Sequence, residues 1–130
     1  KEFRQFLNEN CQILNCKIDY IVDAIDTVKS KLEIIKAAKQ KNIPIISSMG
    51  TANKTNPSLF SITTLDKTSN DPIARILRKK VKDERVRRKF KVVSSTESPL
   101  KAETLGTTSY IPGIAGLLCA SYVINDITKK

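Results

Sequence analysis

A strand, helix, strand pattern between residues 18 and 48 is the feature that most constrains the fold of this chain. Residues 18–23 form a short apolar run rich in β-branched side chains, which is typical of a buried strand. Apolar residues then recur with helical spacing at Val28, Leu32, Ile35 and Ala38. Asn42 suits the left-handed position that ends a helix, and Pro44 opens a second strand over residues 44–48. This βαβ unit predicts an α/β fold whose sheet is at least partly parallel, with a right-handed crossover.

The rest of the chain continues the alternation of strands and helices. Residues 49–59 read as an irregular loop directly after the carboxyl end of a strand, where open α/β sheets bind their ligands. Further strands are expected over residues 60–65 and 90–95, and a helix is expected to start with Asp71 as N-cap and Pro72 as its first residue. A last helix should run from near Pro112 or Gly113 to about Thr128. Its apolar stretch falls short of the ~20 residues that span a bilayer, so we expect a buried helix and no membrane segment.

Length and composition limit both the architecture and the chemistry. The chain has 130 residues, enough for one domain or for part of a larger one, and its 40% hydrophobic content excludes disorder as the main state. It has no His, so neither a Ser-His-Asp or Cys-His arrangement nor a His-containing zinc site can form within it. The chain has three cysteines, Cys11, Cys16 and Cys119, and no CxxC pair. An odd number of cysteines suits reduced, buried thiols in a cytoplasmic protein, and we nominate none of them as catalytic. The chain begins at Lys1 without a signal peptide, so a fragment is possible.

Positive charge is concentrated in one segment. The formal net charge is +10, and residues 75–91 hold ten Lys or Arg and two acids, which gives +8. This pattern fits either the solvated face of an amphipathic helix or a surface that binds a phosphate backbone. Aromatic residues are nearly absent there, which favours a structured RNA or DNA over single-strand stacking. The candidate RNA-binding residues are Arg75, Arg78, Lys79, Lys82, Arg85, Arg87 and Arg88.

Two aspartates follow the first predicted strand. Asp23 and Asp26 fall at the carboxyl edge of the sheet, where a carboxylate can hold Mg²⁺ together with nucleotide phosphates. The alternative for such an Asp is an N-cap, which Asp26 could provide for Val28 or Lys29. Glu97 has the same two interpretations, as a site residue at a strand end or as an exposed loop acid.

Several of these segments match one known family. Residues 19–28 (DYIVDAIDTV), Lys31 and residues 43–50 (IPIISSMG) resemble the second half of the ubiquitin-activating-type adenylyltransferase superfamily, the ThiF/MoeB/HesA type. Other segments look most like its tRNA threonylcarbamoyladenosine dehydratase branch: Asn56 and Pro57, then residues 65–68 (LDKT), 71–74 (DPIA), 75–78 (RILR), 95–97 (STE) and 106–112 (GTTSYIP). The resemblance spans nearly the whole chain.

The resemblance implies an ATP-dependent enzyme. In this family a carboxylate attacks the α-phosphate of ATP to give an acyl adenylate and pyrophosphate, and in the dehydratase branch that carboxylate belongs to threonylcarbamoyladenosine at position 37 of tRNA. Ring closure then releases AMP, with a net loss of water. The Mg²⁺-binding aspartate of the family maps onto Asp26, with Asp23 beside it, and Lys31 stands where several relatives have Arg. The implied cofactors are ATP and Mg²⁺, and the implied partners are the anticodon stem-loop of tRNA and a second copy in a homodimer.

One element of the family is absent. The chain contains no GxGxxG turn for cradling phosphates, which the resemblance places in an N-terminal half. We therefore expect residues 1–130 to be a single partial domain, the C-terminal half of a Rossmann-like mixed sheet, and to be inactive alone. The alternatives are an adenylyltransferase that activates the C-terminal carboxylate of a ubiquitin-like sulfur carrier in thiamine or molybdopterin biosynthesis, and a non-enzymatic basic RNA-binding module.

Overall fold

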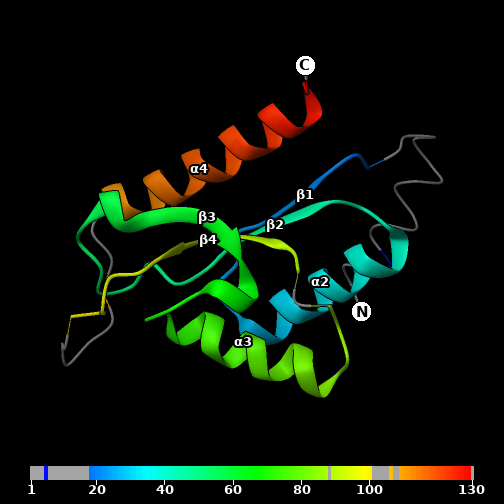
Figure 1. Ribbon diagram of the computed structural model, residues 1–130, viewed down its shortest axis with the longest axis horizontal. Coiled ribbons are helices and arrows are strands. Elements are labelled where there is room, and N and C mark those ends of the chain that lie inside the picture. Colours follow the sequence, from blue (N-terminus) through cyan, green and yellow to red (C-terminus); the bar gives the residue numbers. More distant parts are fainter. Residues whose placement is uncertain (1–4, 6–17, 88, 101–105, 107–108, 130) are drawn as a thin grey trace.

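The described part of the chain forms a four-stranded sheet with helices on both faces (Figure 1). The computed structural model describes residues 5, 18–87, 89–100, 106 and 109–129. The strands are β1 (Ile21–Asp23), β2 (Ile45–Ser48), β3 (Phe60–Thr64) and β4 (Lys91–Ser95), and they lie in the order β1-β2-β4-β3.

The sheet is mixed, as the sequence predicts. β1 pairs in parallel with β2, and β2 pairs in parallel with β4, with Ile21 opposite Ile45 in the first pair. β3 runs antiparallel to β4, and Phe60 lies opposite Ser95. The parallel strands place their carboxyl ends at one edge of the sheet, which makes that edge the expected place for a ligand.

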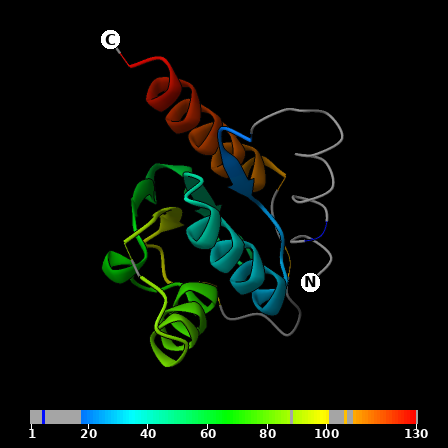
Figure 2. The same cartoon turned by 90° about the vertical axis from the view of Figure 1, so that its right-hand side faces the viewer.

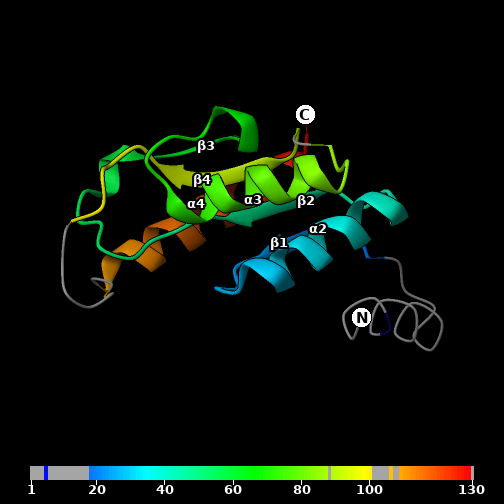
Figure 3. The same ribbon diagram turned by 90° about the horizontal axis from the view of Figure 1, so that it is seen from below.

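The helices form two layers. α2 (Val28–Lys41) and α3 (Pro72–Asp83) lie side by side on one face, and α4 (Tyr110–Ile127) crosses the other face (Figure 2). Figure 3 gives a third view of the same layers, with α2 and α3 in front of the strands. Two short 3-10 helices, η1 (Pro57–Leu59) and η2 (Leu65–Lys67), flank β3, and η1 falls inside the segment that the sequence predicts as an irregular loop. Each face of the sheet has its own apolar cluster, one beneath α2 and α3 and one beneath α4.

The predicted ends of α2 and α3 are largely confirmed. α2 ends at Asn42, whose φ of 58° is left-handed and whose backbone N–H reaches the carbonyls of Ala38 and Lys39. α3 starts with Asp71 as its N-cap, and the Asp71 carboxylate accepts a hydrogen bond of 3.0 Å from the backbone N–H of Ala74. The N-cap interpretation of Asp26 is wrong, because Thr27 occupies that position of α2 and contributes no side-chain cap.

α4 differs from its prediction in two respects. It begins at Tyr110, before Pro112, because a proline within the first turn lacks only an N–H that would have no partner inside the helix. The expectation of a buried helix is wrong: Ile111, Ala115 and Cys119 are buried, whereas Leu117 on the outer side is 68% exposed. A single stripe of α4 therefore packs on the sheet.

Among the described residues, α4 is the one helix long and apolar enough to cross a membrane when length and composition alone are considered. The helix also lies along β2, β3 and β4, and helices that pack on the core of a globular protein meet the same two criteria.

Candidate functional site

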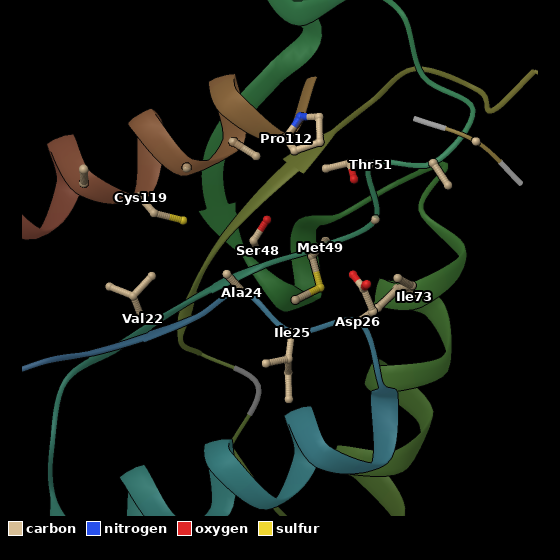
Figure 4. Close-up of a pocket in the computed structure, with 16 residues that line it drawn as sticks. Val22, Ala24, Ile25, Asp26, Ser48, Met49, Thr51, Ile73, Pro112 and Cys119 are labelled. Atoms are coloured by element: carbon tan, nitrogen blue, oxygen red, sulfur yellow. The ribbon is translucent and has the colours of Figure 1, made fainter. Parts of the chain in front are cut away.

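A pocket of about 700 Å³ opens at the carboxyl ends of β1 and β2 (Figure 4). One wall comes from the turn between β1 and α2, and a second wall comes from the loop after β2. α4 closes a third side with small residues, including Ala115, Gly116 and Ala120. The loop that sequence analysis placed at a ligand-binding edge therefore does line a pocket.

Asp26 is the predicted site residue that the structure places on this pocket. It is exposed, and it lies on the same side of the pocket as Met49 and Ile73 (Figure 4). Its carboxylate supplies hard oxygen ligands, which Mg²⁺ prefers, and Mg²⁺ commonly takes one or two protein carboxylates with substrate phosphates. No group of three or more His, Cys, Asp or Glu side chains suited to a metal occurs among the described residues. The donor set thus fits an ion whose remaining ligands are phosphate oxygens and water.

Asp23 and Lys31 form a buried ion pair beneath the turn that carries Asp26. Lys31 Nζ lies 3.0 Å from Asp23 Oδ2, and both side chains are at most 1% exposed. The Ser47 hydroxyl donates a second hydrogen bond to Asp23, and the backbone N–H of Ile25 donates a third at 3.2 Å. Lys31 also donates to the carbonyl of Ser48 at 2.6 Å. Both side chains thereby fix the ends of β1 and β2 and the turn toward Asp26. Direct nucleotide contact by either one stays a prediction.

A second buried cluster fixes the loop after β2. The Asp71 carboxylate accepts hydrogen bonds from the backbone N–H of Gly50 at 3.1 Å and from the Ser94 hydroxyl at 3.2 Å. Lys54 Nζ lies 3.7 Å from Asp71 Oδ2 and donates to the carbonyl of Ser95 at 3.1 Å. Burial lowers the pKa of Lys54, and the nearby Asp71 and Glu97 carboxylates oppose that shift. The cluster joins the loop to the start of α3.

Gly50 is a point of close backbone approach in that cluster. A Cβ at this position would lie 3.2 Å from Asp71 Oδ1, which is closer than most side-chain contacts. The absence of a side chain at Gly50 lets its N–H meet the carboxylate directly.

Glu97 braces a loop and does not line the pocket. Its carboxylate accepts hydrogen bonds from the backbone N–H groups of Asn56 at 2.7 Å and Thr55 at 2.9 Å. These bonds lower the pKa of Glu97 below its usual range, the bond from Asn56 contributing most. Tyr110 donates a hydrogen bond of 2.9 Å to the carbonyl of Thr55 and so ties the same loop to the start of α4.

The predicted RNA-binding residues lie on α3 and on the segment that follows it, and most of them are exposed. Arg75, Lys79, Lys82, Arg85 and Arg87 are exposed, and Arg88 lies outside the described residues. Arg78 differs because it is half-buried and donates to the carbonyl of Thr68 at 3.2 Å and to the Thr68 hydroxyl. It supports η2 and is less available to RNA than its neighbours.

Cys119 is a free, buried thiol on the pocket side of α4. Burial raises its pKa above the ordinary value, and the nearby Lys31 opposes that shift. The prediction of a small buried hydrophobe is confirmed for this residue, whereas Cys11 and Cys16 lie outside the described residues.

Sequence analysis missed the structural roles of Lys54 and Ser47. Both side chains are buried and bond to aspartates at the site. Lys54 lies in a polar loop, where a lysine is ordinarily exposed, and its burial depends on Asp71 and Ser95, which come later in the chain. Local pattern carries no signal for such a contact.

Relatives with established names match most of this chain. It is 34% identical over 137 aligned residues to tRNA threonylcarbamoyladenosine dehydratase of Bacillus subtilis, a match that covers 91% of this chain and 54% of the relative. It is 29% identical to the protein of the same name in Escherichia coli, with coverage of 92% and 43%. The chain therefore spans about half the length of these relatives.

A solved structure and a family model complete the comparison. The E. coli tRNA N6-threonylcarbamoyladenosine dehydratase in complex with ATP superposes with a TM-score of 0.80 at 24% identity, covering 92% of this chain and 52% of that one. The likeness confirms the fold, a Rossmann-like mixed sheet of which this chain holds a part. The ThiF family model matches residues 1–130. The chain therefore belongs to the ThiF family.

Proposed function

We propose that this chain is part of an ATP-dependent tRNA threonylcarbamoyladenosine dehydratase. The main structural support for this proposal is the pocket at the carboxyl ends of β1 and β2, which is lined by Asp26 just before the start of α2. The names of the relatives in B. subtilis and E. coli, and the ATP bound in the E. coli structure, support the same assignment.

In the proposed reaction, a carboxylate oxygen of threonylcarbamoyladenosine at tRNA position 37 bonds to the α-phosphorus of ATP, and the bond from that phosphorus to the bridging oxygen breaks to release pyrophosphate. Ring closure on the activated carbonyl then expels AMP. Mg²⁺ would neutralise triphosphate charge when bound. Asp26 would hold that ion, while the buried pair of Asp23 and Lys31 keeps the turn rigid so that the carboxylate needs no reorganisation.

The proposal extends to the surroundings of the site. The basic segment of residues 75–91, which includes most of α3, would contact the anticodon stem-loop. The phosphate-binding glycine turn, absent from this sequence, would come from another part of the full-length protein. We also predict a cytoplasmic homodimer without membrane attachment.

The test uses the full-length protein that contains this chain, with ATP, Mg²⁺ and tRNA bearing threonylcarbamoyladenosine. Mass spectrometry of the digested tRNA should show loss of one water per modified nucleoside, with one AMP and one pyrophosphate released. Asp26→Asn should lower the rate about 100-fold, because one preorganised charge contact at the transition state is lost. Asp19→Asn, at an exposed residue just before β1, is the matched control and should keep the wild-type rate.

Two alternative functions give different results in this assay. AMP and pyrophosphate formation that needs a ubiquitin-like carrier protein, with tRNA unchanged, would assign the sulfur-carrier reaction. Binding of RNA without any AMP formation by the full-length protein would leave the RNA-binding module.

A further inference from the structure

A second pocket, of about 630 Å³, lies at the other end of the α2 and α3 layer. It is lined by Lys36, Lys39, Gln40, Asn42, Glu84, Arg85, Val86 and Arg87. These residues come from the last two turns of α2, from its C-cap Asn42 and from the segment that follows α3. Since α2 has 14 residues and rises about 1.5 Å per residue, this cleft lies roughly 20 Å from the pocket of Asp26.

The backbone holds two arginines at the mouth of the cleft. The backbone N–H of Val86 bonds to the carbonyl of Val81 at 2.8 Å, and the Val86 side chain packs against the apolar core. Arg85 takes a left-handed conformation with a φ of 58°, and its N–H bonds to the carbonyl of Lys82. Arg85 and Arg87 thus flank an anchored residue, and both remain exposed.

The described residues that line the cleft include four lysines and arginines but only one carboxylate, that of Glu84. Lys36 is paired with Glu84 at 3.2 Å. Within the part of the chain that the structure describes, Lys39, Arg85 and Arg87 form no ion pair. Lys39 Nζ lies 3.5 Å from the carbonyl of Lys89 and 5.7 Å from the centre of the Phe90 ring. Burial lowers the pKa of Lys39, and the charge of Arg87 lowers it further. An anion in the cleft would relieve this repulsion.

We propose that this cleft binds a backbone phosphate of a structured RNA, roughly 20 Å from the pocket that Asp26 lines. The inference rests on the proposed function, and it adds an RNA contact far from the pocket where the proposed reaction takes place. The planar guanidinium groups of Arg85 and Arg87 match the oxygens of a phosphate diester in a bidentate fashion, and Lys39 adds a point charge behind them. A stem of several base pairs would reach from one pocket to the other over the exposed basic residues of α3.

The experiment measures binding of unmodified tRNA to the full-length protein at several salt concentrations, without any requirement for turnover. The variant is Arg85→Ala/Arg87→Ala, and the control is Lys67→Gln/Lys129→Gln, which removes the same charge from exposed residues outside the cleft. The slope of log affinity against log salt should become shallower by about 0.7 to 0.9 in the cleft variant, since this is the contribution of the one phosphate contact that is lost. The single variant Lys39→Gln should change the slope in the same direction, and melting temperatures should confirm that all variants are folded.

The inference is overturned if the cleft variant and the control bind tRNA alike. It is also overturned if the cleft variant binds tRNA normally but loses an acidic ubiquitin-like carrier protein, because the occupant would then be a protein. Failure of the full-length wild-type protein to dehydrate tRNA would contradict the proposed function, while the binding comparison would still report on the cleft.

Discussion

Asp23 and Asp26 show how two acids three residues apart acquire different roles. Asp23 belongs to the strand and points into the layer beneath α2, where Lys31 and Ser47 surround it. Asp26 belongs to the turn, is exposed and lines the pocket. The sequence was sufficient to place both at the sheet edge. It could not separate them, because the burial of Asp23 depends on Ser47 in another strand.

Breaking the buried pair should destabilise the chain strongly. Lys31→Met leaves the Asp23 carboxylate buried without its cation, so we expect the free energy of unfolding to fall by about 3–5 kcal/mol. Lys31→Met/Asp23→Leu should recover part of that loss because no lone charge remains buried. Urea denaturation followed by circular dichroism measures both, with Asp19→Asn as an exposed control. Equal stability of the single and double variants would contradict the assigned pair.

Glu97 should make stability fall at acidic pH. Hydrogen bonds from Asn56 and Thr55 hold its pKa below the ordinary glutamate value of 4.5 in the folded state, so the ionised form is favoured by folding. The stabilisation is complete above the unfolded pKa and is lost as the pH falls through the folded pKa. Glu97→Gln should therefore flatten the decline of the melting temperature below about pH 4.5. If the melting temperature of the Glu97→Gln variant declined at low pH as steeply as that of the wild type, these hydrogen bonds would not favour the ionised form.

At the scale of elements, the start of α3 depends on a local sequence preference and on contacts with residues far away in the sequence. An Asp before Pro is enough to predict the N-cap, since both preferences act within one turn. The contacts of Asp71 with Gly50, Lys54 and Ser94 join three separate segments, and no local pattern reveals them. The prediction that α4 is buried was wrong for a related reason. Apolar residues occur all round this helix, so the sequence did not show which side would pack on the sheet.

Asp71→Ala should cost more than the loss of an ordinary N-cap. Removing a cap costs about 1 kcal/mol, whereas this change also breaks the buried ion pair of Asp71 with Lys54, for a total of about 3–5 kcal/mol. Chemical denaturation gives the value, and Asp83→Ala, at an exposed acid at the end of the same helix, should lie within about 0.5 kcal/mol of wild type. If the free energy of unfolding fell by only about 1 kcal/mol, the N-cap would account for the whole effect and the contact with Lys54 would contribute nothing.

At the scale of the whole molecule, the βαβ unit allowed the α/β class and the partly parallel sheet to be predicted. The order β1-β2-β4-β3 could not be predicted, because it depends on which strand edges pair after the chain has folded. The same limit applies to the second pocket, whose walls come from α2 and from residues 84–87.

This chain alone should not turn over ATP. It presents Asp26 at a sheet edge but carries no GxGxxG turn for the phosphates. We expect no pyrophosphate release above background from residues 1–130, and measurable release from the full-length protein under the same conditions. A sensitive coupled pyrophosphate assay makes the comparison, and turnover by the chain alone would overturn the expectation.

The two layers of helices also give the molecule a permanent electric asymmetry. Lysines and arginines dominate α2 and α3, whereas Asp126 is the single charged residue of α4 on the opposite face. The centre of positive charge is therefore displaced from the centre of mass, and a nearby polyanion exerts a torque as well as an attraction. The protein would rotate its basic layer toward such a partner before contact, so encounter should be faster than for a uniformly charged body and should slow steeply as salt is added.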